Sequence, residues 1–188
     1  MGIDQVIIFV TENPIKTTYS AIRFIADRYR NQFGIFLQSN NKRYWFLFFT
    51  QNKNSVTAKI VRAKKHLGQH FLNDEGIAQQ IVAALQCNVK FTNVLEIGAG
   101  MGVLTKYILK LDAKFYLVEI DHESVAYLES NYPQLSNKII SKDFLKLNLT
   151  QIISAPVAII GNFPYNISTE ILFKVLENKD LVPLVVGM

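Results

Sequence analysis

From position 63 to position 188, short apolar runs alternate with amphipathic segments, and this alternation is the feature that most constrains the fold. Apolar runs bounded by turn residues are typical of buried strands, whereas an apolar stripe at helical spacing indicates a helix packed on one side. Neighbouring parallel strands need a crossover connection, usually a helix, so the alternation predicts an α/β fold with a doubly wound, mainly parallel sheet. The expected strands are 93–97, 114–120, 138–141, 157–160 and 181–186, and the expected helices are 75–86, 103–111, 123–131 and 169–177.

The first third of the chain does not share this pattern. Residues 1–57 are rich in aromatic side chains and show no sustained period, although a short helix over 18–29 and a strand over 43–50 fit locally. We therefore divide the chain into an N-terminal extension of unknown structure, 1–57, and a domain, 58–188, and expect the extension to be dispensable for stability. The apolar run 181–188 then leaves the sheet incomplete at its C-terminal side, with an uncovered edge that favours aggregation.

The net charge of +5 comes from the beginning of the chain. Residues 1–62 hold nine Lys or Arg and three Asp or Glu, which gives +6, while residues 63–188 hold eleven and twelve, which gives −1. Basic charge alone is therefore weak evidence for a nucleic-acid partner. The single cysteine, Cys87, excludes an internal disulfide and a thiolate zinc site and favours a reducing, cytoplasmic setting. Every apolar run is far shorter than the roughly 18 to 20 residues of a membrane span, so no membrane partner is expected.

Three glycines, Gly98, Gly100 and Gly102, stand where the first expected strand turns into a helix. Glycine lets a backbone approach a ligand closely, and the helix N-terminus that follows offers free N–H groups. The spacing is G-x-G-x-G and not the G-x-G-x-x-G of dinucleotide-binding folds, which argues against NAD. The pattern favours a ligand-binding turn, and a tight turn without a ligand is the alternative.

Polar residues also follow the other strands. Glu119 lies at the carboxyl end of the second strand, where an acidic side chain can accept both hydroxyls of a ribose; helix capping is the alternative, which suits Asp121 better. Asp143 can accept a hydrogen bond from the exocyclic amine of adenine, although taken alone it is an ordinary loop residue. Open α/β sheets bind ligands at the carboxyl edge. The residues at successive strand ends, 23, 24 and 19 positions apart, are Glu96, Glu119, Asp143 and Asn162.

The most specific motif is Asn-Phe-Pro-Tyr at positions 162–165, directly after a strand. Pro164 fixes the local backbone, so the carbonyl groups around it and the side-chain oxygen of Asn162 can converge as acceptors. Tyr165 offers a flat face for stacking. Together these groups would receive a planar base that bears an amino group. A proline turn with a core tyrosine is the alternative.

Four segments carry a family resemblance. They are KKHLGQHFLND at 64–74, EIGAG at 96–100, VEID at 118–121 and GNFPYNIST at 161–169. Together they resemble the ribosomal RNA adenine N6-dimethyltransferases, in particular their small-subunit (16S) type. The resemblance covers residues 58–188, and family members continue well beyond the position of Met188, so the chain resembles a C-terminally truncated member. His70 stands where many members have Asn.

The resemblance implies a Rossmann-like methyltransferase fold, with S-adenosylmethionine as methyl donor and N6 of adenine in small-subunit ribosomal RNA as acceptor. The implied cofactor-binding residues are His70, Leu72, Gly98, Gly100, Glu119, Asp143 and Asn162. The implied catalytic residues are Asn162, Pro164 and Tyr165, with acceptors holding the amine of a flipped adenine and the tyrosine stacking on it. Because the sulfonium methyl is already activated, no strong general base is required.

The implied partner is ribosomal RNA in the 30S particle, modified by a cytoplasmic monomer during ribosome biogenesis. His66 and His70 are four positions apart without a nearby third ligand, so no metal is expected. Two alternatives stay open. One is methylation of 23S-type RNA or of DNA adenine, because the motif reads the base and not the sugar. The other is a non-catalytic RNA-binding or assembly relic, and we expect the truncated chain to be a poor enzyme.

Overall fold

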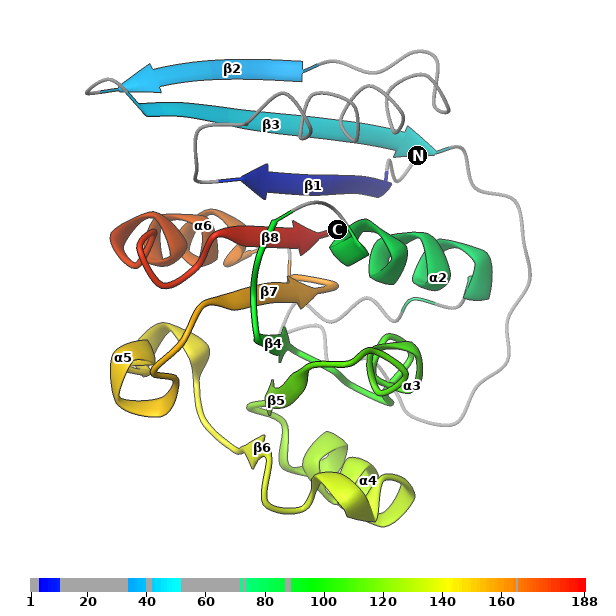
Figure 1. Cartoon of the computed structure of the whole chain (residues 1–188). Coiled ribbons are helices and arrows are strands. Elements are labelled where there is room, and N and C mark those ends of the chain that lie inside the picture. The colour runs from blue at the N-terminus through cyan, green and yellow to red at the C-terminus, as the bar shows by residue number, and fades with distance from the viewer. Residues whose placement is uncertain are drawn as a thin grey trace.

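A computed structural model describes residues 4–10, 34–39, 42–51, 72, 74–86, 89–164 and 166–188. Within these residues, eight strands form one sheet in the order β2-β3-β1-β8-β7-β4-β5-β6 (Figure 1). The strands are β1 (Asp4–Val10), β2 (Gly34–Ser39), β3 (Lys42–Gln51), β4 (Asn93–Ile97), β5 (Lys114–Val118), β6 (Ile139–Ile140), β7 (Val157–Gly161) and β8 (Leu184–Gly187). Strands β4 to β8 pair in parallel, while β1 is antiparallel to both β3 and β8.

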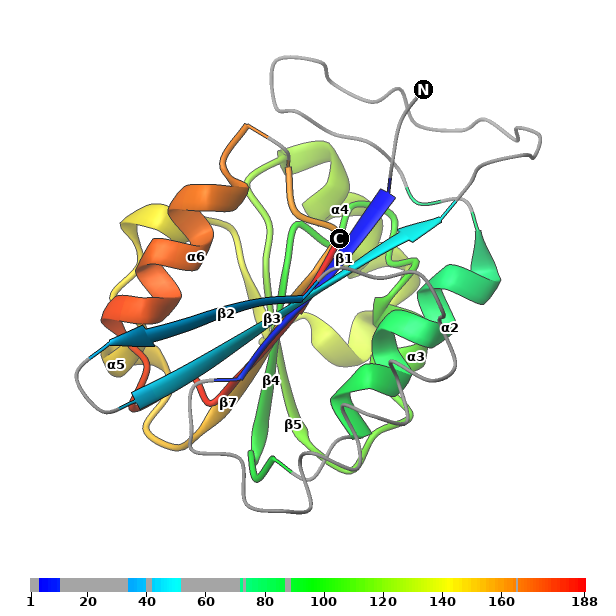
Figure 2. The ribbon, with the colours of Figure 1, turned by 90° about the horizontal axis from the view of Figure 1, so that it is seen from above.

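Helices cover both faces of the parallel part of the sheet. They are α2 (Glu75–Ala83), α3 (Thr105–Ile108), α4 (His122–Asn131), α5 (Leu149–Ile152) and α6 (Ser168–Glu177), with 3₁₀ turns at Ala84–Gln86, Pro133–Leu135 and Phe144–Lys146. Figure 2 shows α2, α3 and α4 on one face and α5 and α6 on the other. This arrangement confirms the predicted doubly wound, mainly parallel α/β fold. In the described part of the chain, no helix is long and apolar enough to cross a membrane.

The central strands supply two separate cores, one on each face. In β4, Val94 packs into the core beneath α2, α3 and α4, while Leu95 packs into the core beneath α5 and α6. Ile160 and Ile159 of β7 divide in the same way, and all four side chains are almost completely buried. Burying each of them contributes roughly 2 kcal/mol. Burial on both faces explains why these runs are apolar without alternation.

Local chemistry sets where the first helix begins. Asp74 caps α2, because its Oδ1 accepts a hydrogen bond from the N–H of Ile77 at 3.1 Å. The helix buries Ala78, Ile81 and Val82 and continues into a 3₁₀ turn, so the prediction of a helix over 75–86 is confirmed with a tighter last turn. The helix predicted over 103–111 is shorter, because turn geometry continues from the glycines up to Thr105.

The sheet continues beyond β8, contrary to the expectation of an uncovered edge. Strand β1 pairs with it in antiparallel register, from Ile7 opposite Gly187 to Val10 opposite Leu184. The expectation was wrong because strand pairing uses backbone N–H and C=O groups, which a search for side-chain periodicity does not detect. Strand β3 confirms the strand predicted over 43–50. The helix predicted over 18–29 lies outside the described residues.

Candidate cofactor site

A cavity of about 230 Å³ lies at the carboxyl ends of β4, β5 and β7. It brings together seven of the nine residues that the sequence assigned to the site: Leu72, Gly98, Gly100, Glu119, Asp143, Asn162 and Pro164. The other two, His70 and Tyr165, lie outside the described residues. The strand-end register therefore placed the polar residues at one edge of the sheet, as ligand sites in open α/β sheets require.

The glycine turn after β4 forms one wall of the cavity. Gly98, Gly100 and Gly102 all have positive φ angles, of 69°, 54° and 77°. Left-handed backbone of this kind is strained for other residues. A Cβ atom at Gly98 would have no protein atom within 4 Å, so conformation, and not protein packing, demands glycine there. The turn thus presents bare backbone to the cavity.

Glu119 connects the end of β5 to the glycine turn. Its Oε2 accepts a hydrogen bond from the N–H of Gly100 at 3.0 Å, and its Oε1 accepts from the N–H groups of Ile120 and Asp121 at 2.8 and 2.9 Å. The side chain is 3% exposed. Because these two N–H groups bind the carboxylate, the strand predicted over 114–120 ends at Val118. Glu119 is therefore both a lining residue and a brace of the turn.

Glu96 lies beneath the turn, at the end of β4. Its side chain is buried, and its Oε2 accepts a hydrogen bond from the Thr105 hydroxyl at 2.7 Å. Burial raises the pKa of Glu96 to about 8; the Thr105 hydrogen bond opposes this shift and the nearby carboxylate of Glu119 adds to it. The lining of the cavity thus includes a carboxyl group whose pKa burial holds well above its usual value.

Asp143 and Asp121 occupy capping positions. Asp143 Oδ1 accepts a hydrogen bond from the N–H of Leu145 at 2.9 Å, which caps the 3₁₀ turn that follows, and the residue also lines the cavity. Asp121 is at the N-cap position of α4, as expected, but its Oδ2 accepts from the Ser124 hydroxyl at 3.0 Å instead of capping the backbone. Only Asp143 of these two is among the residues that line the cavity.

The loop after β7 contributes Asn162 and Pro164 to the cavity. The carbonyl of Pro164 accepts hydrogen bonds from the Ser168 hydroxyl at 2.9 Å and from the N–H of Ile167 at 3.1 Å. Two hydrogen bonds use both lone pairs of a carbonyl oxygen. Acceptors for a bound amine therefore have to come from the Asn162 side chain and the other carbonyls of the loop.

Sequence reasoning missed the side chain that fixes this loop. Phe163 is buried, and its ring covers the α-carbons of Gly161 and Gly187, where added Cβ atoms would lie 2.7 and 2.2 Å from ring carbons. It also missed Ile120, which lines the cavity although 49% of it is exposed. Their place in the sequence could have indicated both residues, because each directly follows a residue that was predicted to belong to the site.

Comparisons with known proteins agree with the fold and with the motifs of the site. A model of the family described as "Ribosomal RNA adenine dimethylase" matches residues 60–186. Among solved structures, a dimethyladenosine transferase from Plasmodium falciparum is 26% identical with a TM-score of 0.52, over 63% of this chain and 42% of that one. The 23S rRNA methyltransferase ErmE, 24% identical with a TM-score of 0.52 over 63% of this chain and 47% of its own, shares the fold.

Curated relatives are more similar still. "Ribosomal RNA small subunit methyltransferase A" of Cytophaga hutchinsonii is 57% identical over 68% of this chain and 50% of its own length. The protein of the same name from Flavobacterium johnsoniae is 56% identical over 68% of this chain and 49% of its own. The chain thus spans about half the length of the curated relatives it matches. The match over residues 60–186 and these identities place the chain in the ribosomal RNA adenine dimethylase family.

Proposed function

We propose that residues 58–188 are the cofactor-binding part of an S-adenosylmethionine-dependent adenine N6-dimethyltransferase that acts on small-subunit ribosomal RNA. One observation carries the proposal: a single cavity collects the glycine turn, Glu119, Asp143 and Asn162 from separate strand ends. The names of the relatives support the small-subunit substrate over 23S-type RNA or DNA. In this proposal residues 1–57 are an extension of the methyltransferase unit, and the protein is a cytoplasmic monomer.

The residues of the cavity fit S-adenosylmethionine. Bare backbone at Gly98 and Gly100 would face the methionine part, while Glu119 would accept a ribose hydroxyl and Asp143 the adenine amine. Three N–H donors already bind Glu119, so a hydroxyl would take its remaining lone pair or replace one of them. His70 and Leu72 would form the rim. When bound, S-adenosylmethionine supplies a methyl group that its sulfonium has already activated.

The loop after β7 would hold the acceptor base. Asn162 and a neighbouring carbonyl would accept hydrogen bonds from the N6 hydrogens and favour a pyramidal nitrogen, with Tyr165 stacking on the flipped adenine. The carbonyl of Pro164 is already used, so we give Pro164 the role of shaping the backbone. One acceptor remains useful after the first transfer, which is compatible with dimethylation.

A second candidate is a protein that binds the cofactor without transferring methyl groups to 30S particles. The observation that favours it is the make-up of the cavity, because five of the seven assigned residues that line it are assigned to the cofactor alone.

The two candidates differ in one assay. Calorimetry with S-adenosylmethionine should show binding in both, and transfer of labelled methyl groups to undermethylated 30S particles should occur only if the chain is an enzyme. Asn162→Ala should abolish transfer while leaving the melting temperature close to that of the unmodified chain. Binding without transfer by the unmodified chain would favour the non-catalytic candidate, and absence of binding would refute both.

A further inference from the structure

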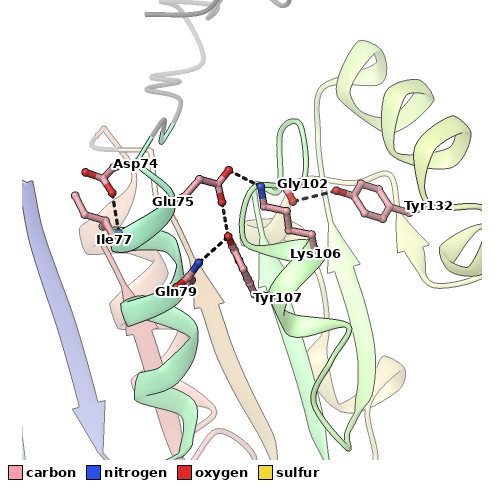
Figure 3. Close-up of polar contacts among 8 residues, drawn as sticks. All are labelled: Asp74, Glu75, Ile77, Gln79, Gly102, Lys106, Tyr107 and Tyr132. Atoms are coloured by element: carbon pink, nitrogen blue, oxygen red, sulfur yellow. Dashed lines mark hydrogen bonds and ion pairs between the residues drawn. The ribbon is translucent and has the colours of Figure 1, made fainter. Parts of the chain in front are cut away.

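A cluster of polar side chains joins α2 to α3 (Figure 3). The carboxylate of Glu75, in the first turn of α2, accepts hydrogen bonds from Lys106 Nζ and from the Tyr107 hydroxyl, both on α3. Gln79, one turn further along α2, donates from Nε2 to the same hydroxyl at 3.1 Å. A single carboxylate therefore holds two adjacent residues of the helix that follows the glycine turn.

Tyr132 holds the turn from another side. Its hydroxyl donates to the carbonyl of Gly102 at 3.2 Å (Figure 3). Its ring also covers the α-carbon of Gly102, because an added Cβ atom there would lie 2.7 Å from a ring carbon. The third glycine of the turn is therefore fixed by a side chain from beyond the end of α4, at the C-cap position.

None of these side chains lines the cavity, but residues that come shortly before each of the two helices do. The residue that lines it before α2 is Leu72, two positions ahead of the capping Asp74. The glycine turn lines it before α3 through all of its residues from Gly98 to Leu104 except Gly102, which lies between two lining residues. The contact between α2 and α3 thus joins the two helices that follow two separate parts of the cavity wall.

From this placement we infer that Glu75, Lys106, Tyr107 and Tyr132, here called the outer brace, are positioning residues that set the affinity for S-adenosylmethionine. The inference rests on the proposed function and adds residues to it that do not touch the cofactor. The side chains of Glu75 and Lys106 are 53% and 38% exposed, and an ion pair so exposed adds little to stability. We therefore expect the ion pair to act on the shape of the cavity and so on the affinity for S-adenosylmethionine. Holding a site in its binding conformation reduces the entropy that binding costs.

The charges around the outer brace favour the contact of Lys106 with both Glu75 and Tyr107. The Lys106 hydrogen bond, and then that of Tyr107, hold the pKa of Glu75 below its usual value. The ammonium groups of Lys106 and Lys110 lie 5.3 and 5.2 Å from the centre of the Tyr107 ring, within the range of cation–π attraction. The contact between α2 and α3 thus depends on the positive charge of Lys106, and Lys106→Arg, which keeps that charge, should preserve it.

The test uses the full chain and three variants: Lys106→Met, Tyr132→Phe, and the conservative Lys106→Arg. Lys90→Met is the matched control, because it removes an exposed lysine outside the brace. Calorimetry should show a dissociation constant for S-adenosylmethionine raised about two- to fivefold in the first two variants, with Tm lowered by no more than about 4 °C. Lys106→Arg and the control should bind as the unmodified chain does. Hydrogen exchange at the Gly102 amide, which donates to Ala99, should be faster only in the first two variants.

The outcomes separate the inference from the proposed function. If the unmodified chain binds and Lys106→Met and Tyr132→Phe bind equally well, the positioning role is refuted and the proposed function stands. An equal loss of affinity in Lys106→Arg, or a loss that accompanies a large fall in Tm, would make the brace merely structural and would also refute the positioning role. If the unmodified chain does not bind S-adenosylmethionine, both fail together.

Discussion

Glu96 should make the stability of the protein fall as pH rises toward neutrality, and Glu96→Gln should remove this dependence. Burial raises the pKa of Glu96 from 4.5 to about 8 in the folded chain, whereas an unfolded chain exposes it to water. Between these two values the folded state holds a proton that the unfolded state has released. Stability from this group is therefore fully present below about pH 4.5 and is lost as pH rises through about 8.

The size of the effect follows from the two pKa values. Between pH 5.5 and 7.5 nearly the full slope of about 1.4 kcal/mol per pH unit applies, so the wild-type chain should lose about 2 to 3 kcal/mol of unfolding free energy from Glu96 alone. Glutamine carries no titrating proton and keeps an oxygen that can accept from the Thr105 hydroxyl, 2.7 Å from Oε2 in the structure. In the Glu96→Gln variant, position 96 should therefore contribute no pH dependence to the unfolding free energy over this range, and only the other titrating groups should do so.

Urea unfolding at several pH values measures the difference directly. Subtracting the curve of Glu96→Gln from that of the unmodified chain isolates this one group, and Glu177→Gln, on an exposed residue of α6, controls for loss of an ordinary carboxylate. If the curves of the unmodified chain and Glu96→Gln stay parallel from pH 5.5 to 7.5, Glu96 is ionised in the folded protein and the reasoning is wrong.

Three further predictions follow from contacts of the site and the sheet. Glu119→Ala should weaken S-adenosylmethionine binding by about 1 to 3 kcal/mol, because charge-assisted hydrogen bonds are lost, and equal affinity by calorimetry would exclude the ribose role. Gly187→Ala should lower stability by about 1 to 3 kcal/mol in urea unfolding, because the new Cβ would lie 2.2 Å from the Phe163 ring; an unchanged midpoint would show that the ring moves freely. Deleting residues 1–57 should lower Tm and promote aggregation by exposing the edge of β8, and an unchanged Tm would restore the view that the extension is dispensable.

The parts of this fold that depend on neighbouring residues were predictable, and those that depend on distant pairing were not. The run from β4 through the glycine turn to α3 could be recognised because strand, turn and helix are consecutive and each leaves a local pattern. The antiparallel pairing of β1 with β8 leaves no local pattern in the sequence, since the two strands come from opposite ends of the described chain.

The site divides in the same way. The positions of Glu119 and Asp143 at the cavity could be predicted because strand ends in a parallel sheet meet at one edge, and a count of positions is enough to place them there. The hydrogen bond from Gly100 to Glu119 was not foreseeable, because it depends on how closely the turn approaches the next strand. The contact of Tyr132 with Gly102 joins positions 30 apart, with no motif at the tyrosine to indicate it.

The pairing of β1 with β8 also has a consequence for the order of folding. Ile7 and Gly187 are 180 positions apart, so of the described strands β1 is synthesised first and its partner last. Contacts of such sequence separation form slowly, because loop closure must be completed before they contribute any free energy. Strand β3 can pair with one edge of β1 early in synthesis. The other edge of β1, whose sequence includes the apolar run VIIFV, stays unpaired until nearly all of the described chain has left the ribosome. We therefore expect the nascent chain to be a chaperone client, released once β8 has added to the sheet.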